Sequence, residues 1–99
     1  MENNEIVLEF EKTITNLAGN RMGNQIYMDK VEPKLDMKKV NIVVFPVIIE
    51  DIASSFIEGM YKKLGETYGK NEAIKIMVLK AQNEEANEKI KESIDTFGV

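Results

Sequence analysis

The sequence predicts one small α/β domain over residues 1–99, in which a three- to four-stranded, mostly parallel or mixed sheet packs with about three helices. The chain has 99 residues, which suffices for one hydrophobic core. Its composition is 43% hydrophobic and 30% charged, as in ordinary folded domains. Apolar, β-rich segments alternate with amphipathic segments. Helices placed between apolar strands imply parallel pairing with right-handed crossovers.

The N-terminal third is expected to form a strand, a loop and a short helix. Glu5–Phe10 alternates in polarity and is rich in β-formers, which predicts a strand. Thr13–Leu17 also has β-propensity and can add a strand hairpinned to the first. Apolar residues at helical spacing predict a helix over about Gly23–Val31, and Pro33 should end or kink it.

The middle of the chain predicts a buried strand followed by a capped helix. Val40–Phe45 is a near-continuous apolar run, typical of a central strand covered on both faces. Ser55–Glu58 matches a capping box, so a helix is expected to start there and to end at Gly69 in a left-handed C-cap. Its buried stripe is expected to consist of Phe56, Ile57, Met60, Tyr61 and Leu64.

The C-terminal third predicts one more strand and one more helix. Ala73–Leu79 reads as a third strand, and Glu84–Phe97 as a third helix that stops at Gly98. Glu85 and Lys89 have the spacing of a helical ion pair. The inward side chains of this helix are expected to be Ala86, Ile90, Ile94 and Phe97.

The residue types that are absent narrow the possible functions. The chain has no Cys and no His, which removes thiol nucleophiles, disulfides, zinc-finger ligands and the usual general base at neutral pH. Its acidic residues do not follow calcium-loop spacing. We therefore expect no metal site, no cofactor and no catalytic activity.

Charge and hydropathy indicate where the protein works. A net charge of −4 lowers the odds of nucleic-acid binding, although an acidic inhibitor that competes with nucleic acid stays open. The first residues lack a basic and an apolar signal region, and no apolar run approaches the ~20 residues of a spanning helix. A cytoplasmic protein without membrane contact is expected.

Two hydroxyls and one guanidinium are the candidate site groups. Ser54 and Ser55 lie at a strand-to-helix turn, where helix N-termini can receive anions. Their structural explanation is helix capping. Arg21, between Gly19 and Gly23 near a helix start, can bind an anion or pair with a surface carboxylate.

The segment IVVFPVIIEDIASSFIEGMYKKL resembles the STAS-like domains of unknown function, which are relatives of anti-sigma factor antagonists. The matching positions are Ile49, Ile52, Ala53, Ser54, Ser55 and Phe56, with a weaker match at Gly19-Asn-Arg21. Phe45-Pro46 departs from the family pattern, which has Asp-Phe there.

This resemblance implies a STAS-like sandwich without catalysis, whose protein partner is often a GHKL-type ATPase acting as serine kinase or anti-sigma factor. It aligns Ser55 with the phosphorylated serine. We therefore expect a regulatory interaction module that is switched at Ser55. Its docking surface is expected to comprise Asp51, Ser54, Ser55, Phe56, Ile57 and Tyr61. The alternative is a small anion or nucleotide sensor that uses Arg21 and the Ser54/Ser55 helix start.

Overall fold

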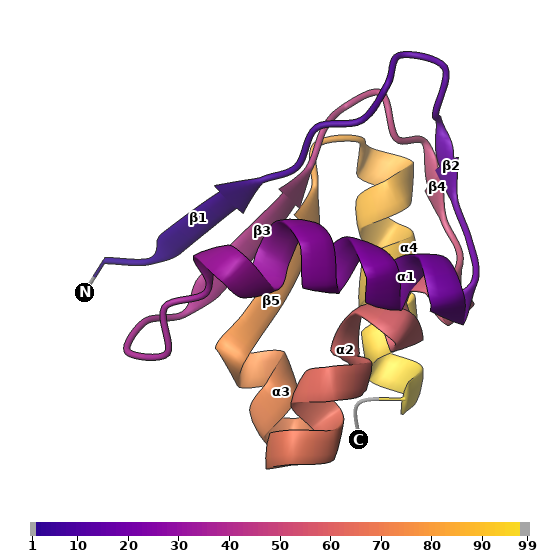
Figure 1. The fold of residues 1–99 in the computed structure, drawn as a ribbon. Coiled ribbons are helices and arrows are strands. Elements are labelled where there is room, and N and C mark those ends of the chain that lie inside the picture. Colours follow the sequence, from indigo (N-terminus) through magenta and orange to yellow (C-terminus); the bar gives the residue numbers. More distant parts are fainter. Residues whose placement is uncertain (1, 98–99) are drawn as a thin grey trace.

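The computed structural model describes residues 2–97 and confirms the α/β class (Figure 1). A π-helical segment (Tyr27–Val31) and a 3₁₀ turn (Glu32–Lys34) continue the first helix up to the region of Pro33. The other elements, in chain order, are β1 (Asn4–Val7), β2 (Asn16–Leu17), α1 (Asn20–Ile26), β3 (Asn41–Phe45), β4 (Asp51–Ile52), α2 (Ser54–Tyr68), α3 (Lys70–Ile76), β5 (Met77–Ala81) and α4 (Glu84–Phe97).

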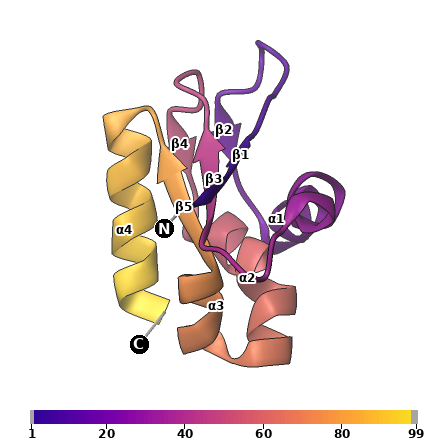
Figure 2. The same cartoon turned by 90° about the vertical axis from the view of Figure 1, so that its left-hand side faces the viewer.

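The main sheet has the strand order β1-β3-β5, and both pairings are parallel. The central place predicted for Val40–Phe45 is thus confirmed for β3. A second, two-stranded parallel sheet joins β2 to β4. Figure 2 shows α1 near β1 and α4 beside β5, and α2 packs against both of these helices.

The hydrophobic core lies between one face of the main sheet and the helices α1, α2 and α4. Val43 and Phe45 are fully buried on that face, whereas their neighbours Ile42 and Val44 are only half-buried. The prediction that this strand is covered on both faces was therefore wrong. Two successive right-handed crossovers along the order β1-β3-β5 place both crossing helices on the same face. α4 packs beside β5 and against α2, so it leaves the other face of β1 and β3 without a helix.

The N-terminal elements differ from the prediction in extent and pairing. β1 ends at Val7, three residues before the predicted end of the strand. β2 pairs with β4, about 35 residues further along the chain, and not with β1. The expected hairpin was wrong because Thr15 O accepts the amide hydrogen of Glu50 and so directs this segment to β4. The helix predicted from about Gly23 begins earlier, at Asn20.

The predicted strand over Ala73–Leu79 was wrong in its first half, because Lys70–Ile76 forms α3. Gly69 ends α2 at the predicted position, and its positive φ of 89° favours glycine. Its ψ of 156° lies outside the left-handed helical region that was predicted for this cap. The Gly69 carbonyl accepts a hydrogen bond from Ala73 N. The strand then begins at Met77. A short apolar run such as AIKI has no decisive periodicity, so packing decides between helix and strand.

The last helix matches its predicted bounds, and its residues Ala86 and Ile90 are buried as expected, with Ile94 partly buried. The side chain of Phe97 and the predicted stop at Gly98 lie outside the described residues. Lys89 pairs with Asp51 in place of Glu85. None of the helices formed by residues 2–97 is long and apolar enough to cross a membrane.

A buried asparagine ties one end of the main sheet together. The Asn41 side chain is fully buried, and its Oδ1 accepts hydrogen bonds from Asn4 Nδ2 (2.7 Å) and Asp36 N (2.9 Å). Its Nδ2 donates to the carbonyls of Asp36 (3.0 Å), Lys39 (3.2 Å) and Ile76 (3.1 Å). One amide therefore joins β1, the loop before β3 and the end of α3, and it satisfies its own buried polar atoms.

Candidate functional site

The two-stranded sheet brings the starts of α1 and α2 together. β2 leads into α1 through Gly19, and β4 leads into α2 through Ala53. The strands are parallel, so both helices begin at the same end of the pair (Figure 1). Ala53 N donates to Leu17 O (2.8 Å), which continues the pairing to the first residue before α2.

Ser55 joins the two helix starts but does not cap α2. The helix begins at Ser54, and its N-cap is Ala53, whose carbonyl accepts from Phe56 N (3.0 Å). No side chain caps this end, so the predicted capping box was wrong. The Ser55 hydroxyl oxygen accepts instead from the amide of Gly19 (3.0 Å), the N-cap residue of α1. The partly buried serine thus accepts a hydrogen bond from the N-cap amide of the neighbouring helix.

Two glycines let α1 and α2 approach until their backbones touch. A Cβ on Gly59 would overlap the carbonyl oxygen of Asn20, and a Cβ on Gly23 would overlap that of Phe56. Sequence reasoning missed this crossing. The available signal was a pair of small residues four apart in each helix, with Gly19 before Gly23 and Ser55 before Gly59, since small residues on one helix face permit close backbone approach.

The apolar half of the predicted docking surface belongs to the core. Phe56 and Ile57 are fully buried, and Tyr61 is 5% exposed. Phe56 packs edge-on against Phe45 at 6.0 Å between ring centroids. These three side chains belong to the apolar stripe of α2, which faces α1 and the sheet. They are therefore not accessible to a partner in this conformation.

Tyr61 also has a buried polar role that the sequence did not reveal. Its hydroxyl donates to Met77 O (2.6 Å), where β5 begins. Burial raises the pKa of this phenol above its usual value, because the phenolate would lose its hydration. The bond ties α2 to an edge strand of the main sheet.

The polar half of the predicted surface remains accessible next to α4. Asp51 Oδ1 lies 3.3 Å from Lys89 Nζ, and both side chains are about half exposed. Ser54 is exposed and borders an open hollow of about 400 Å³ whose other wall is α4. Asp51, Ser54 and Ser55 are therefore neighbours along the exposed start of α2.

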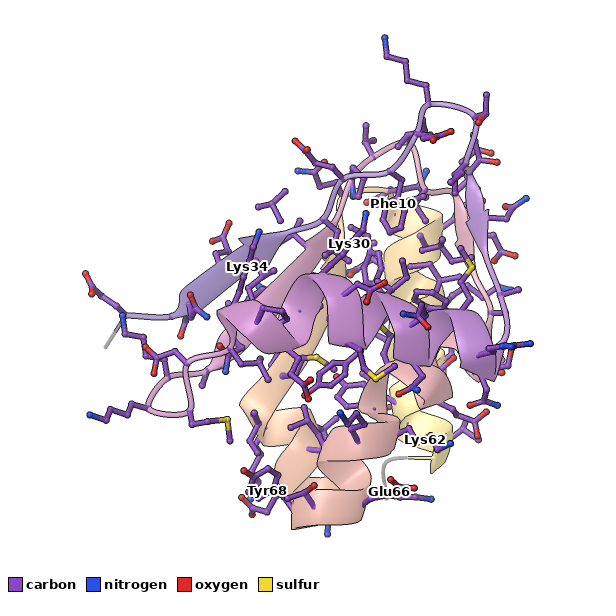
Figure 3. All side chains as sticks on the ribbon, viewed as in Figure 1. Phe10, Lys30, Lys34, Lys62, Glu66 and Tyr68 are labelled. Carbon is purple, nitrogen blue, oxygen red and sulfur yellow. The ribbon has the colours of Figure 1, made fainter. Side chains whose placement is uncertain are left out.

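Arg21 is exposed in the first turn of α1. Among residues 2–97 no carboxylate forms an ion pair with it, so the predicted surface pair is not found. A hollow of about 420 Å³ opens between α2 and α3, near the start of α1. Arg21 does not line it. Lys62 and Lys70 do, together with Glu58 and Glu66, so its charges offset one another (Lys62 and Glu66 are labelled in Figure 3).

Within residues 2–97, no three acidic side chains gather where they could hold a metal ion. Away from the helix starts, Lys30 contacts the segment that follows β1. Its Nζ lies 5.0 Å from the Phe10 ring centroid and donates a hydrogen bond to Glu9 O (2.8 Å; Lys30 and Phe10 are labelled in Figure 3). This lysine holds the segment after β1 onto the helical layer.

Comparison of the chain with models of protein families, with curated proteins and with solved structures finds no match. The likeness to STAS-like domains therefore stays a prediction that depends on the residues around Ser55.

Proposed function

We propose that this chain is a non-catalytic regulatory interaction module of the STAS-like kind, with Ser55 as its control point. One observation carries the proposal: the Ser55 hydroxyl accepts a hydrogen bond from Gly19 N across the starts of two helices. A chemical change at this oxygen acts on both helices at once. The exposed groups beside it, Asp51 and Ser54, are available to a partner.

Phosphorylation of Ser55 would have a discrete effect at this position. The phosphoryl group adds nearly two negative charges and the volume of three oxygens where Gly19 now approaches the hydroxyl. One turn further along α2, Gly59 lies directly against the backbone of Asn20, so the two helices are already in contact and leave no spare room for the added group. The modified serine must turn outward or separate the helix starts, and either change alters the surface that includes Ser54.

The partner in this proposal is a cytoplasmic protein, such as a GHKL-type ATPase that acts as serine kinase or anti-sigma factor. Such a partner would supply the phosphoryl group and read the result. Binding would then depend on the modification state of one serine, without turnover of a substrate by this chain.

The test compares retention of host proteins by immobilised wild-type protein, Ser55→Asp and Thr67→Asp. Thr67 is the matched control, because it is an exposed hydroxyl residue near the other end of α2, away from the proposed surface. The proposal predicts a partner that Ser55→Asp loses and Thr67→Asp keeps, together with a phosphoryl group on Ser55 in protein purified from its host and analysed by mass spectrometry. A partner retained equally by all three proteins would refute the switch.

The alternative, an anion or nucleotide sensor at Arg21 and the Ser54/Ser55 helix start, also stays a prediction. Its test is the melting temperature during a titration with inorganic phosphate or a nucleotide. A rise in the wild-type protein that Arg21→Gln abolishes would favour the sensor. Equal melting temperatures with and without these anions would reject it.

A further inference from the structure

The main sheet has an apolar face that is left largely uncovered. Figure 2 shows α1 near β1 and α4 beside the edge strand β5, and both helices pack against α2, which lies on the core side of the sheet. Over β1 and β3 the opposite face has no helix. Parallel sheets almost always have both faces covered, because their strands carry apolar side chains on both sides. The open face is thus the least expected surface of this fold.

Six side chains point outward on this face, in two rows fixed by the strand register. The first row is Glu5, Ile42 and Val78, and the second is Val7, Val44 and Lys80. Val7 is 55% exposed, and the other three apolar side chains are half-buried. None of these four belongs to the core or packs against it. Their contact with water is therefore a property of this surface.

The charges on the face are arranged so that the surface complements itself. Glu5 and Lys80 stand at diagonally opposite corners of the two rows, and both are exposed. Consider a two-fold axis that lies in the interface along the other diagonal, from Val7 to Val78. Rotation about it brings Glu5 of one copy opposite Lys80 of the other, and the reverse pair forms by symmetry. The apolar side chains then meet in the centre.

We propose that a second copy of this chain docks on the open face, sheet against sheet, with reciprocal Glu5–Lys80 pairs. The strands of the two copies cross near a right angle, which is one of the two usual ways in which sheets pack. This surface lies on the side of the sheet away from the α1–α2 contact. It does not involve Ser55, so it stands or falls independently of the proposed switch.

The size of the face sets the strength of the dimer. Three strands about 4.8 Å apart and two rows about 7 Å apart give a central patch of roughly 200 Å². Stable complexes bury ~800 Å² on each partner. The dimer is therefore weak and forms at high protein concentration, with α4 and the loops at the rim adding to the contact.

The test measures association by sedimentation velocity over a concentration series up to about 1 mM, a level chosen for weak complexes. Glu5→Lys sets two like-charged pairs in the dimer, and Lys80→Glu does the same with the opposite sign. Each variant alone should weaken dimerisation roughly tenfold or more. Lys62→Glu and Glu66→Lys are matched controls on α2 that change net charge equally and should dimerise like the wild type.

The decisive measurement mixes the two single variants. In the mixed dimer, Lys at position 5 faces Glu at position 80, and Lys80 faces Glu5, so both pairs are again complementary. The mixture should associate like the wild type, and so should the double variant Glu5→Lys/Lys80→Glu. Circular dichroism and melting temperature confirm that each protein is folded. A wild type that stays monomeric throughout, or a mixture no stronger than its components, would overturn the proposal.

Discussion

Two glycines in one helix are expected to respond in opposite directions to the same substitution. Gly59 and Gly65 both lie in α2. A Cβ at Gly59 would overlap Asn20 O and would lie 2.8 Å from its carbonyl carbon and 2.9 Å from its Cα. At Gly65 a Cβ would meet no atom within 4 Å. Gly59→Ala therefore tests the backbone contact between α1 and α2, and Gly65→Ala reports helix propensity alone.

The magnitudes follow from these distances. Carbon atoms pack best at about 3.5–4.0 Å, so α1 and α2 must separate by roughly 1 Å to accept the Gly59→Ala methyl group. Such overpacking costs about 1–3 kcal/mol, and loss of the Ser55–Gly19 hydrogen bond adds about 1 kcal/mol. The gain in helix propensity returns about 1 kcal/mol. We expect a net loss of about 2 kcal/mol for Gly59→Ala and a gain of about 1 kcal/mol for Gly65→Ala.

Urea unfolding followed by circular dichroism measures both free energies of unfolding. With a slope of about 1 kcal/mol per M for a domain of this size, the two midpoints should differ by roughly 3 M. Gly23→Ala should resemble Gly59→Ala, and the double variant should lose less than the sum, because the helices are already apart. Equal midpoint shifts for Gly59→Ala and Gly65→Ala would refute the close crossing of α1 and α2.

Three further predictions concern buried and exposed polar groups. Asn41→Asp places a carboxylate against three carbonyl oxygens, so we expect the free energy of unfolding in urea to fall by several kcal/mol. This loss should shrink as the pH falls and the carboxyl group protonates. Full stability at neutral pH would contradict the prediction. Burial, with Glu32 and Tyr68 nearby, raises the pKa of Tyr27 to about 12. The neutral phenol of Tyr27 therefore stabilises the fold fully below about pH 10, the phenol pKa of the unfolded chain, and this stabilisation is lost toward pH 12. Tyr27→Phe should flatten this decline when unfolding is measured over an alkaline pH series. Lys89→Ala should lower stability by no more than about 0.5 kcal/mol, because its ion pair with Asp51 is half exposed, and a larger loss would show that α4 depends on this pair.

The predictable parts of the fold are those with a long, regular pattern. The apolar run of β3 and the amphipathic stripes of α2 and α4 each repeat a period over enough residues to fix the element type. The segment before Met77 failed because four residues cannot distinguish the two periods. Its helical form depends on Gly69 behind it and on Asn41, which binds Ile76 O.

The candidate site was predictable in position but not in its contacts. The sequence placed Ser54 and Ser55 at the start of a helix, and the structure has α2 beginning at Ser54. The partner of Ser55 is Gly19, 36 residues earlier, so no local pattern could identify it. The assignment of Phe56, Ile57 and Tyr61 to both a buried stripe and a docking surface was inconsistent, and burial resolved it in favour of the core.

The sequence by itself determined the α/β class, the central strand, the longer helices and the residues at the start of α2, because local periodicity and turn chemistry are properties of neighbouring residues. Only the tertiary structure decided which amide Ser55 serves, how closely Gly23 and Gly59 bring two helices together, and which face of the main sheet stays open. A run of β-branched residues has the same sequence pattern whether a helix covers that face of the strand or water does. The direction of the crossovers, a property of the whole chain path, determines which of the two occurs.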